Sequence, residues 1–335
     1  MKTLIVSPPT RSQVYGGLVE FAAVEIPVWA GIIADYLERH GYPAAVLDAE
    51  AEGLSVEATA KVIYNRAPDL AVFSVYGQQP SASTQCLPAA ERVVELMRME
   101  AEGRFSTARI PALCLGTHPS ALPERTLREG PWTYVAQGEG QRTVLGLLHS
   151  MASKEGFSEV PGLWARLPGN HVLSPSTAPA KALDLELEFP TRGLHRFDFS
   201  RYRAHNWHAF GWSSRSPYAS LQTSLGCPFR CTFCCINAPF DSASIRFWSV
   251  ENVLRQLDDL ASRGVVHIKI PDDMFVLNPR HVEGICDGII ARGHRFNIWA
   301  YGRVDTLKDD RLLAKMKRAG FNWLGLGIES GSKFV

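Results

Sequence analysis

Apolar and polar positions alternate in a regular order along the first 155 residues of the chain. Short apolar runs of the kind that form buried parallel strands are separated by segments with apolar positions at helical spacing. The five runs are Lys2–Val6, Ala44–Leu47, Leu70–Val75, Ala112–Leu115 and Thr133–Ala136. Strands that alternate with helices predict an α/β domain with a doubly wound parallel sheet. In such sheets ligands bind beyond the carboxyl ends of the strands.

Residues 156–215 and 216–335 follow different patterns. The first segment has a hairpin pattern around Pro168 and then a stretch dense in aromatic and basic residues, so we interpret it as an interdomain linker. In the second segment strands and helices alternate again, and Ser249 and Asn278 are favourable N-caps for two of the helices. The predicted strands are Ser220–Leu225, Val265–Ile270, Phe296–Tyr301 and Trp323–Ile328. Four parallel strands are too few to close a barrel, so we expect a partial (β/α) barrel, truncated after its fourth strand.

The overall composition is that of an ordinary globular protein, with 46% apolar and 21% charged residues. Lys and Arg number 35 against 34 for Asp and Glu, so the net charge of +1 lacks the basic excess typical of nucleic-acid-binding proteins. No apolar run approaches the roughly 20 residues of a membrane span, and the first residues lack the features of a signal peptide. We therefore expect a cytoplasmic protein that binds neither nucleic acid nor a membrane.

The seven cysteines are unevenly placed, and four of them lie within residues 227–235. An odd number without spaced pairs argues against a disulfide framework. Cys227, Cys231 and Cys234 supply three thiolates from one loop at the end of a predicted strand, whereas Cys235 points elsewhere. Three ligands leave one iron of a [4Fe–4S] cube open to a substrate or cofactor. The alternatives are buried free thiols or a structural zinc site, for which no second CxxC or HxxxH pair is present.

This cysteine spacing, CxxxCxxC after the first strand of a βα barrel, resembles the signature of the radical S-adenosylmethionine (SAM) superfamily. The residues from Thr223 to Cys234 resemble the branch with an N-terminal cobalamin (B12)-binding domain. The resemblance implies a Rossmann-like cobalamin-binding domain over 1–155, a linker over 156–215 and a radical SAM core over 216–335. It also implies three cofactors, namely a [4Fe–4S] cluster, SAM and cobalamin.

The resemblance implies a SAM site at the strand ends of the second domain. The residues concerned are Phe233, Asp272, Asp273, Arg303 and Glu329. Phe233 would lie beside the adenine, and the two aspartates would hold the methionine amino group by Coulomb attraction. Arg303 would meet the SAM carboxylate, and Glu329 would reach the cofactor pocket. The alternatives are a turn that leads into a helix for the aspartates and an ion pair with Asp305 for the arginine.

For cobalamin, the resemblance implies contacts at the ends of the third, fourth and fifth strands. The residues concerned are Ser74, Gly116, Thr117, His118, Gly138, Glu139 and Gly140. Glycines let the backbone approach a bulky ligand closely. The chain lacks the Asp-x-His-x-x-Gly motif of better-known cobalamin proteins, so we expect no lower cobalt ligand from that motif. His118 is either a cobalt ligand or a partner in a loop hydrogen bond.

Residues 201–208 combine Arg, Tyr, His and Trp side chains, and three roles for them are open. They could line a substrate cavity, stack on RNA bases or pack between the two domains. Interdomain packing is the most common role for long basic and aromatic side chains, which fill interfaces well.

Together these implications predict a cobalamin-dependent radical SAM enzyme. It would cleave SAM reductively with electrons from a flavodoxin or ferredoxin, and it would methylate an unactivated carbon of a small-molecule metabolite. Ring-forming or rearranging enzymes share the same motifs and are an alternative within the superfamily. The alternative from a different class is a non-catalytic module that binds cobalamin or a cluster.

Overall fold

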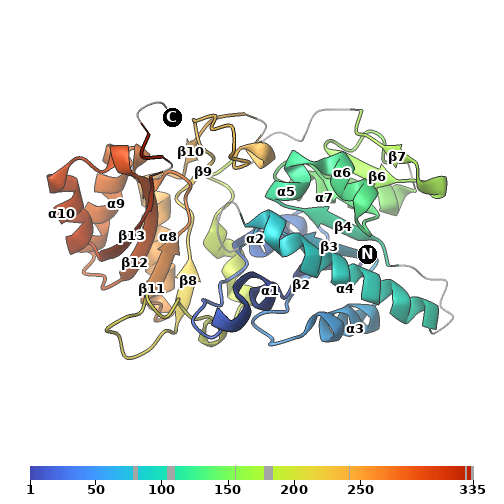
Figure 1. Ribbon diagram of the computed structural model, residues 1–335, viewed down its shortest axis with the longest axis horizontal. Coiled ribbons are helices and arrows are strands. Elements are labelled where there is room, and N and C mark those ends of the chain that lie inside the picture. The colour runs from blue at the N-terminus through green and yellow to red at the C-terminus, as the bar shows by residue number, and fades with distance from the viewer. Residues whose placement is uncertain are drawn as a thin grey trace.

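The computed structural model describes residues 1–77, 82–103, 110–154, 156–176, 184–240, 242–328 and 330–332. Two sheets, each with its own helices, lie toward opposite ends of an elongated molecule (Figure 1). Residues that follow strands of both sheets line one cavity between them. The carboxyl ends of the strands, where α/β proteins bind ligands, therefore lie next to this cavity in both sheets.

The first sheet confirms the predicted doubly wound arrangement, with β2, β1, β3, β4 and β5 parallel in that order. Its strands are β1 (Thr3–Ser7), β2 (Ala44–Asp48), β3 (Leu70–Ser74), β4 (Ala112–Leu115) and β5 (Tyr134–Ala136). The helices are α1 (Arg11–Tyr15), α2 (Val28–Arg39), α3 (Val56–Arg66), α4 (Ser83–Gly103), α5 (Thr117–Ala121), α6 (Pro123–Glu129) and α7 (Gln141–Ser153). Ile33 and Leu147 join the hydrophobic core on one face of the sheet, and Ile63 and Val94 join the core on the other.

The hairpin pattern around Pro168 forms two further strands of this same sheet. They are β6 (Leu163–Arg166), which pairs antiparallel with β5, and β7 (Val172–Leu173), which pairs antiparallel with β6. The turn between them includes Gly169 at a φ of 74°, a conformation that glycine adopts without steric cost. The hairpin covers the edge of β5 that the parallel strands leave open.

The second sheet is parallel in the order β13, β12, β11, β8. Its strands are β8 (Tyr218–Ser220), β11 (His267–Ile270), β12 (Asn297–Arg303) and β13 (Phe321–Gly327), and its helices are α8 (Val250–Ser262), α9 (Pro279–Ala291) and α10 (Asp310–Arg318). Both expected N-caps are confirmed, because the side chains of Ser249 and Asn278 accept hydrogen bonds from the first turns of α8 and α9. Ile268 and Ile298 pack into the same core as Leu257 of α8.

The predicted strand Ser220–Leu225 is divided in the structure. Its second part is β9 (Ser224–Leu225), which pairs antiparallel with β10 (Arg246–Phe247) in a separate small sheet. The Asp272 carboxylate accepts hydrogen bonds from the backbone N–H of Thr223 at 2.8 Å and from the Ser224 hydroxyl at 2.7 Å. These bonds hold the chain in a turn after β8. The spacing of apolar residues does not predict this turn.

The aromatic and basic stretch packs on the face of the second sheet that its helices leave uncovered. The Trp207 ring contacts the rings of Trp299 and Trp323 edge-to-face, with centroids 4.7 and 5.1 Å apart. His208 and Asn297 exchange two hydrogen bonds of 3.0 and 2.7 Å. The stretch also touches the first domain, since a short bridge pairs Val24 with Arg203. Of the three roles left open by the sequence, packing between the domains is the one that the structure shows.

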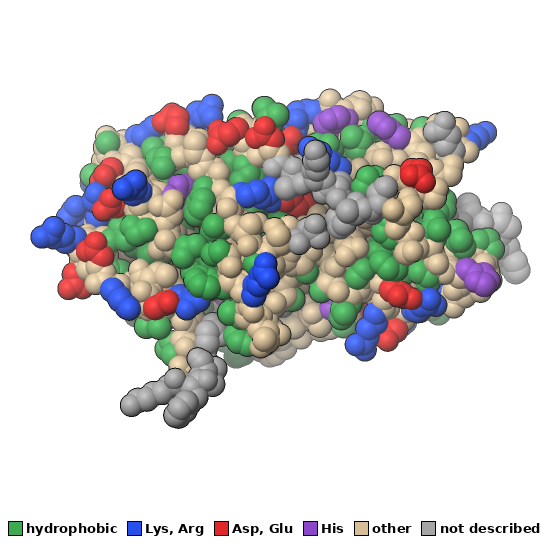
Figure 2. All heavy atoms as spheres, turned by 90° about the horizontal axis from the view of Figure 1, so that it is seen from above, with side chains coloured by type: hydrophobic (Ala, Val, Ile, Leu, Met, Phe, Trp, Pro, Cys, Tyr) green, Lys and Arg blue, Asp and Glu red, His purple; other side chains and the backbone are tan. Residues whose placement is uncertain are grey.

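The outer surface carries charges of both signs. On the face shown in Figure 2, Lys and Arg side chains are interspersed with Asp and Glu side chains. This distribution agrees with the net charge of +1. Within the described ranges, no helix combines the length and the apolar character that crossing a membrane requires.

The buried carboxyl of Asp48 at the end of β2 gives a testable dependence of stability on pH. It accepts a hydrogen bond from the Tyr202 hydroxyl at 2.8 Å, and burial raises its pKa from 3.8 to about 7. The folded protein therefore binds more protons than the unfolded chain between these two values, so stability falls as the pH rises through this window. We expect Asp48→Asn, which keeps the hydrogen bond, to gain free energy of unfolding relative to the parent between about pH 4 and about pH 8. Urea unfolding of both proteins at these pH values measures this difference, and a pH-independent difference would contradict it.

Candidate active site

The cysteine loop follows β9 and is held by its own residues. Gly226 has a φ of 86°, and a Cβ at this position would lie 2.4 Å from the Ser244 carbonyl oxygen, so only glycine fits here. The backbone N–H of Cys227 donates to Asn237 Oδ1 at 3.1 Å, and Asn237 Nδ2 donates to the Phe229 carbonyl at 2.9 Å. The Asn237 side chain thus bonds to both Cys227 and Phe229 and holds the first half of the loop in place. Sequence reasoning missed Asn237, although a polar residue of this type close after the cysteines is a typical loop-closing residue.

The three cysteines of the motif border a common cavity of about 370 Å³. Their thiols are free; Cys227 is half-buried, whereas Cys231 and Cys234 are exposed. Burial raises the pKa of the Cys227 and Cys234 thiols. No three His, Cys, Asp or Glu side chains of the described residues converge on a single point, as a mononuclear metal site requires. A cube takes each thiolate to a different iron, and three thiols that border one cavity are compatible with such a cluster.

The two adjacent aspartates have different surroundings. Besides the bonds to the Thr223 N–H and to Ser224, Asp272 accepts a hydrogen bond from the Thr223 hydroxyl at 2.6 Å, so its carboxylate is occupied by protein donors. Asp273 instead borders the cysteine cavity. Burial raises the pKa of Asp272 to about 6, and burial together with the neighbouring Asp272 charge raises that of Asp273 to about 8. Asp272 therefore positions the turn, whereas Asp273 borders the cavity.

The other expected SAM residues lie around the same cavity as far as the structure describes them. Arg303 at the end of β12 borders the cavity with its guanidinium 4.2 Å from the Phe229 ring centroid. It also forms the ion pair considered as its alternative, with Nε and Nη2 at 3.0 and 2.9 Å from the Asp305 carboxylate. Phe233 is 71% exposed at the cavity rim. Glu329 lies outside the described residues.

Of the residues expected for cobalamin, two border the cavity at the strand ends of the first domain. Ser74 and Thr117 are buried and border the cavity between the domains. His118 takes the loop role, because its Nδ1 lies 2.9 Å from the Thr84 hydroxyl and its backbone N–H donates to Ser83 at 3.0 Å. Burial lowers the pKa of this imidazole.

Glycines shape the two loops beside these residues. Gly116 has a φ of 147°, and a Cβ there would lie 2.2 Å from the Val75 carbonyl oxygen. Gly138 and Gly140 have φ values of 101° and 92°. The buried Gln141 follows directly, and both polar atoms of its side chain lack a hydrogen-bond partner in the described structure. Gly116 and Gly140 let the loops after β4 and β5 pack closely on Val75 and Leu115, next to Thr117, which borders the cavity between the domains.

Glu139 has a role that its position in the sequence did not indicate. Its buried carboxylate forms an ion pair with Arg246 on β10, which belongs to the other half of the molecule. The Tyr76 hydroxyl donates to the Glu139 carbonyl at 3.3 Å. The loop that contains Glu139 therefore connects the first domain to β10, which pairs with the strand that precedes the cysteine loop.

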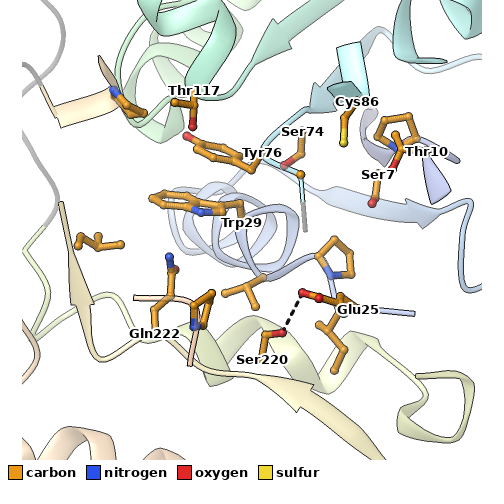
Figure 3. Close-up of a pocket in the computed structure, with 18 of the residues that line it drawn as sticks. Ser7, Thr10, Glu25, Trp29, Ser74, Tyr76, Cys86, Thr117, Ser220 and Gln222 are labelled. Carbon is orange, nitrogen blue, oxygen red and sulfur yellow. Dashed lines mark hydrogen bonds between the residues drawn. The ribbon is translucent and has the colours of Figure 1, made fainter. Parts of the chain in front are cut away.

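The cavity between the domains is bordered by both halves of the chain (Figure 3). The rings of Trp29 from α2 and Tyr76 after β3 both border it and stack directly on each other, with centroids 4.4 Å apart. Gln222 and Asp273 border it from the second domain. Asp273 borders the cysteine cavity as well, so the two cavities adjoin at this residue.

Comparison with known families agrees with this arrangement. Residues 221–335 match the family described as the Radical SAM superfamily, and residues 16–148 match the B12 binding domain. The chain belongs to the radical SAM superfamily, in the branch with a B12-binding domain. A radical SAM domain implies SAM and a [4Fe–4S] cluster, and a B12-binding domain implies cobalamin.

Relatives of this radical SAM protein are similar along nearly its whole length. It is 27% identical to the uncharacterized methyltransferase PH0819 of Pyrococcus horikoshii, over 99% of this chain and 66% of the relative. It is 24% identical to the anaerobic magnesium-protoporphyrin IX monomethyl ester cyclase of Cereibacter sphaeroides, over 99% and 51%. The structure of the radical SAM methyltransferase TsrM from Kitasatospora setae, with cobalamin and a [4Fe–4S] cluster bound, has a TM-score of 0.68 at 17% identity, over 98% of this chain and 58% of that chain. The chain thus shares the fold and spans between about half and two thirds of these relatives.

Proposed function

We propose that the protein is a cobalamin-dependent radical SAM enzyme that methylates an unactivated carbon of a small-molecule metabolite. The observation that carries this proposal is the position of Asp273, which borders both the cysteine cavity and the cavity between the domains. A SAM molecule at the first cavity and cobalamin at the second would meet at this residue. The methyltransferase relative and the likeness to TsrM support methyl transfer.

The proposal assigns the cofactors to residues of this chain. Cys227, Cys231 and Cys234 hold the cluster. Phe233, Asp273, Arg303 and Glu329 hold SAM. The loops with Ser74, Gly116, Thr117, His118, Gly138, Glu139 and Gly140 hold cobalamin. When bound, the reduced cluster and SAM supply an adenosyl radical that removes a hydrogen atom, and cobalamin supplies a methyl group.

The protein's own residues prepare the site for this chemistry. Asp272 fixes the turn before the cysteine loop, and Asn237 fixes the loop itself. Burial raises the pKa of Asp273 to about 8, and a methionine ammonium beside this carboxyl would favour its ionised form and pair with it. The stacked rings of Trp29 and Tyr76 give the cavity between the domains an apolar wall. The pair between Glu139 and Arg246 keeps the domains together.

A labelling experiment tests the proposed methyl transfer without knowledge of the substrate. The anaerobically reconstituted protein with cobalamin is reduced and given SAM that carries a deuterated methyl group. We expect S-adenosylhomocysteine and deuterated methylcobalamin, measured by mass spectrometry, together with 5′-deoxyadenosine. Cofactor binding without any SAM-derived product would identify a non-catalytic module and contradict the proposal.

A ring-forming or rearranging enzyme is the second candidate, and the similarity to the cyclase favours it. In the labelling experiment such an enzyme would release 5′-deoxyadenosine and form no S-adenosylhomocysteine. For either reaction we propose a cytoplasmic location and a flavodoxin or ferredoxin as electron donor, since the cluster must be reduced by single electrons.

A further inference from the structure

Glu139 lies between two glycines in the loop after β5 and joins the two halves of the molecule. It is 6% exposed, and its carboxylate forms an ion pair with the Arg246 guanidinium. Gly138 and Gly140 on either side of it have φ values of 101° and 92°. Because glycines restrict the backbone less than other residues do, the contacts of Glu139 hold this loop in place.

Arg246 in turn packs against the start of the cysteine loop. On β10 it pairs with Leu225 of β9, which lies just before Gly226 and Cys227. The Arg246 guanidinium lies 5.7 Å from the centroid of the Phe240 ring. This ring lies 3.4 Å from the position that a Cβ of Gly226 would take, so it packs closely on that glycine. A displacement of Arg246 therefore acts on the backbone before Cys227 both through β9 and through Phe240.

The segment that follows the cysteines packs on another loop of the first domain. Ile236 borders both the cysteine cavity and the cavity between the domains. The short helical turn η5 (Ala238–Phe240) contacts α5, which begins at Thr117. The elements that flank the cysteine loop therefore contact both of the loops that the proposed function assigns to cobalamin, one through Arg246 and the other through η5.

We propose that Glu139 and Arg246 are positioning residues that couple the two cofactor sites, so that a cluster in the cysteine loop raises the affinity of the protein for cobalamin. The inference rests on the proposed function, from which it takes both cofactor assignments. When three thiols hold a cluster, the cysteine loop is fixed, and β9 and β10 are fixed with it. Arg246 then holds the Glu139 loop in place before cobalamin binds, so less affinity is lost to ordering of that loop. Linkage requires that bound cobalamin favours the cluster-loaded protein by the same factor.

Equilibrium dialysis of cyanocobalamin tests this coupling through binding alone. The cyanide ligand keeps the cobalt from binding free thiols of the cluster-free protein, and elemental analysis measures cobalt in each chamber. We expect the anaerobically reconstituted parent to bind cyanocobalamin at least about fivefold more tightly than the same protein freed of iron by chelation. In Arg246→Met, which keeps a long apolar side chain against Phe240 and removes the charge, the two affinities should be equal.

Two double variants separate this role from a loss of stability, which would weaken cobalamin binding by both forms of the protein and leave the ratio of their affinities unchanged. Arg246→Met leaves the buried Glu139 carboxylate without this cationic partner and should lower the melting temperature. Glu139→Gln with Arg246→Met removes that charge too, so it should melt closer to the parent while its two affinities stay equal. Glu38→Met with Arg196→Met breaks a matched ion pair, whose residues border neither cavity, and should keep the affinity ratio of the parent.

Equal affinities of the cluster-loaded and cluster-free parent would overturn the proposal. A parental ratio that persists in Arg246→Met would also overturn it, because the coupling would then run through Asp273 and Ile236, which border both cavities. So would loss of the ratio in the Glu38 and Arg196 control, since the effect would then not be specific to the Glu139 loop. A parent that binds no cobalamin in either form would contradict the proposed function itself, whereas equal binding by both forms would leave that function intact.

Discussion

Cys231→Ala is expected to abolish release of 5′-deoxyadenosine from the anaerobically reconstituted, reduced protein. Two thiolates would remain to hold a cluster that takes one protein ligand on each of three irons. We expect the rate to fall by at least about a thousandfold, equivalent to about 4 kcal/mol in activation free energy. Chromatographic measurement of the nucleoside, with iron and sulfide contents of each preparation, gives the result.

Cys235→Ala is the matched control for this prediction. Cys235 is a half-buried free thiol beside the motif, and it does not border the cysteine cavity. Like Cys231→Ala, this variant removes one thiol from the loop. Because this thiol is not a predicted ligand, the variant should keep both its iron content and its 5′-deoxyadenosine release. Loss of both in the Cys235 variant, with release retained in the Cys231 variant, would show that the ligand assignment is wrong.

Gly116→Ala is expected to cause the second large effect, on cobalamin binding and on stability. The added Cβ would lie 2.2 Å from the Val75 carbonyl oxygen, in a backbone conformation with a φ of 147°. Backbone strain and overlap together should lower the free energy of unfolding by about 2–5 kcal/mol. The loop between β4 and α5 must then shift, and we expect cobalamin affinity, followed by absorbance, to fall at least about a hundredfold.

Gly41→Ala separates strain from overlap. Gly41 also has a positive φ, of 84°, but a Cβ there would meet no atom within 4 Å. The free energy of unfolding of this variant should fall by only about 1 kcal/mol, and the variant should bind cobalamin as the parent does. Equal losses of stability and of cobalamin binding in the two variants would mean that the close approach at Gly116 has no special role.

The sequence was sufficient where the structure depends on local signals. Ser249 and Asn278 cap helices through bonds to residues three positions away, which the residue types alone indicate. The cysteine motif likewise sits in one loop, so its spacing is enough to bring three thiols around one cavity. Apolar runs with helices between them also predicted that the first sheet is parallel and doubly wound.

The sequence was insufficient where the partner lies far along the chain. The ion pair of Glu139 with Arg246 spans 107 positions, and that of Glu25 with Lys269 spans 244. Both depend on how two separately folded sheets dock, which no periodicity encodes. The different roles of Asp272 and Asp273 also depend on distant partners, because Thr223 and Ser224, 49 and 48 positions earlier in the same domain, decide which carboxylate accepts hydrogen bonds.

The most direct test of the central claim is electron paramagnetic resonance of the reduced, anaerobically reconstituted protein before and after addition of SAM. Three cysteine ligands leave one iron of the cube for the amino and carboxylate groups of SAM, so the signal of the reduced cluster should change its g values when SAM is added. A cluster signal that is identical with and without SAM, or a purified protein that holds zinc in place of iron, would contradict the claim.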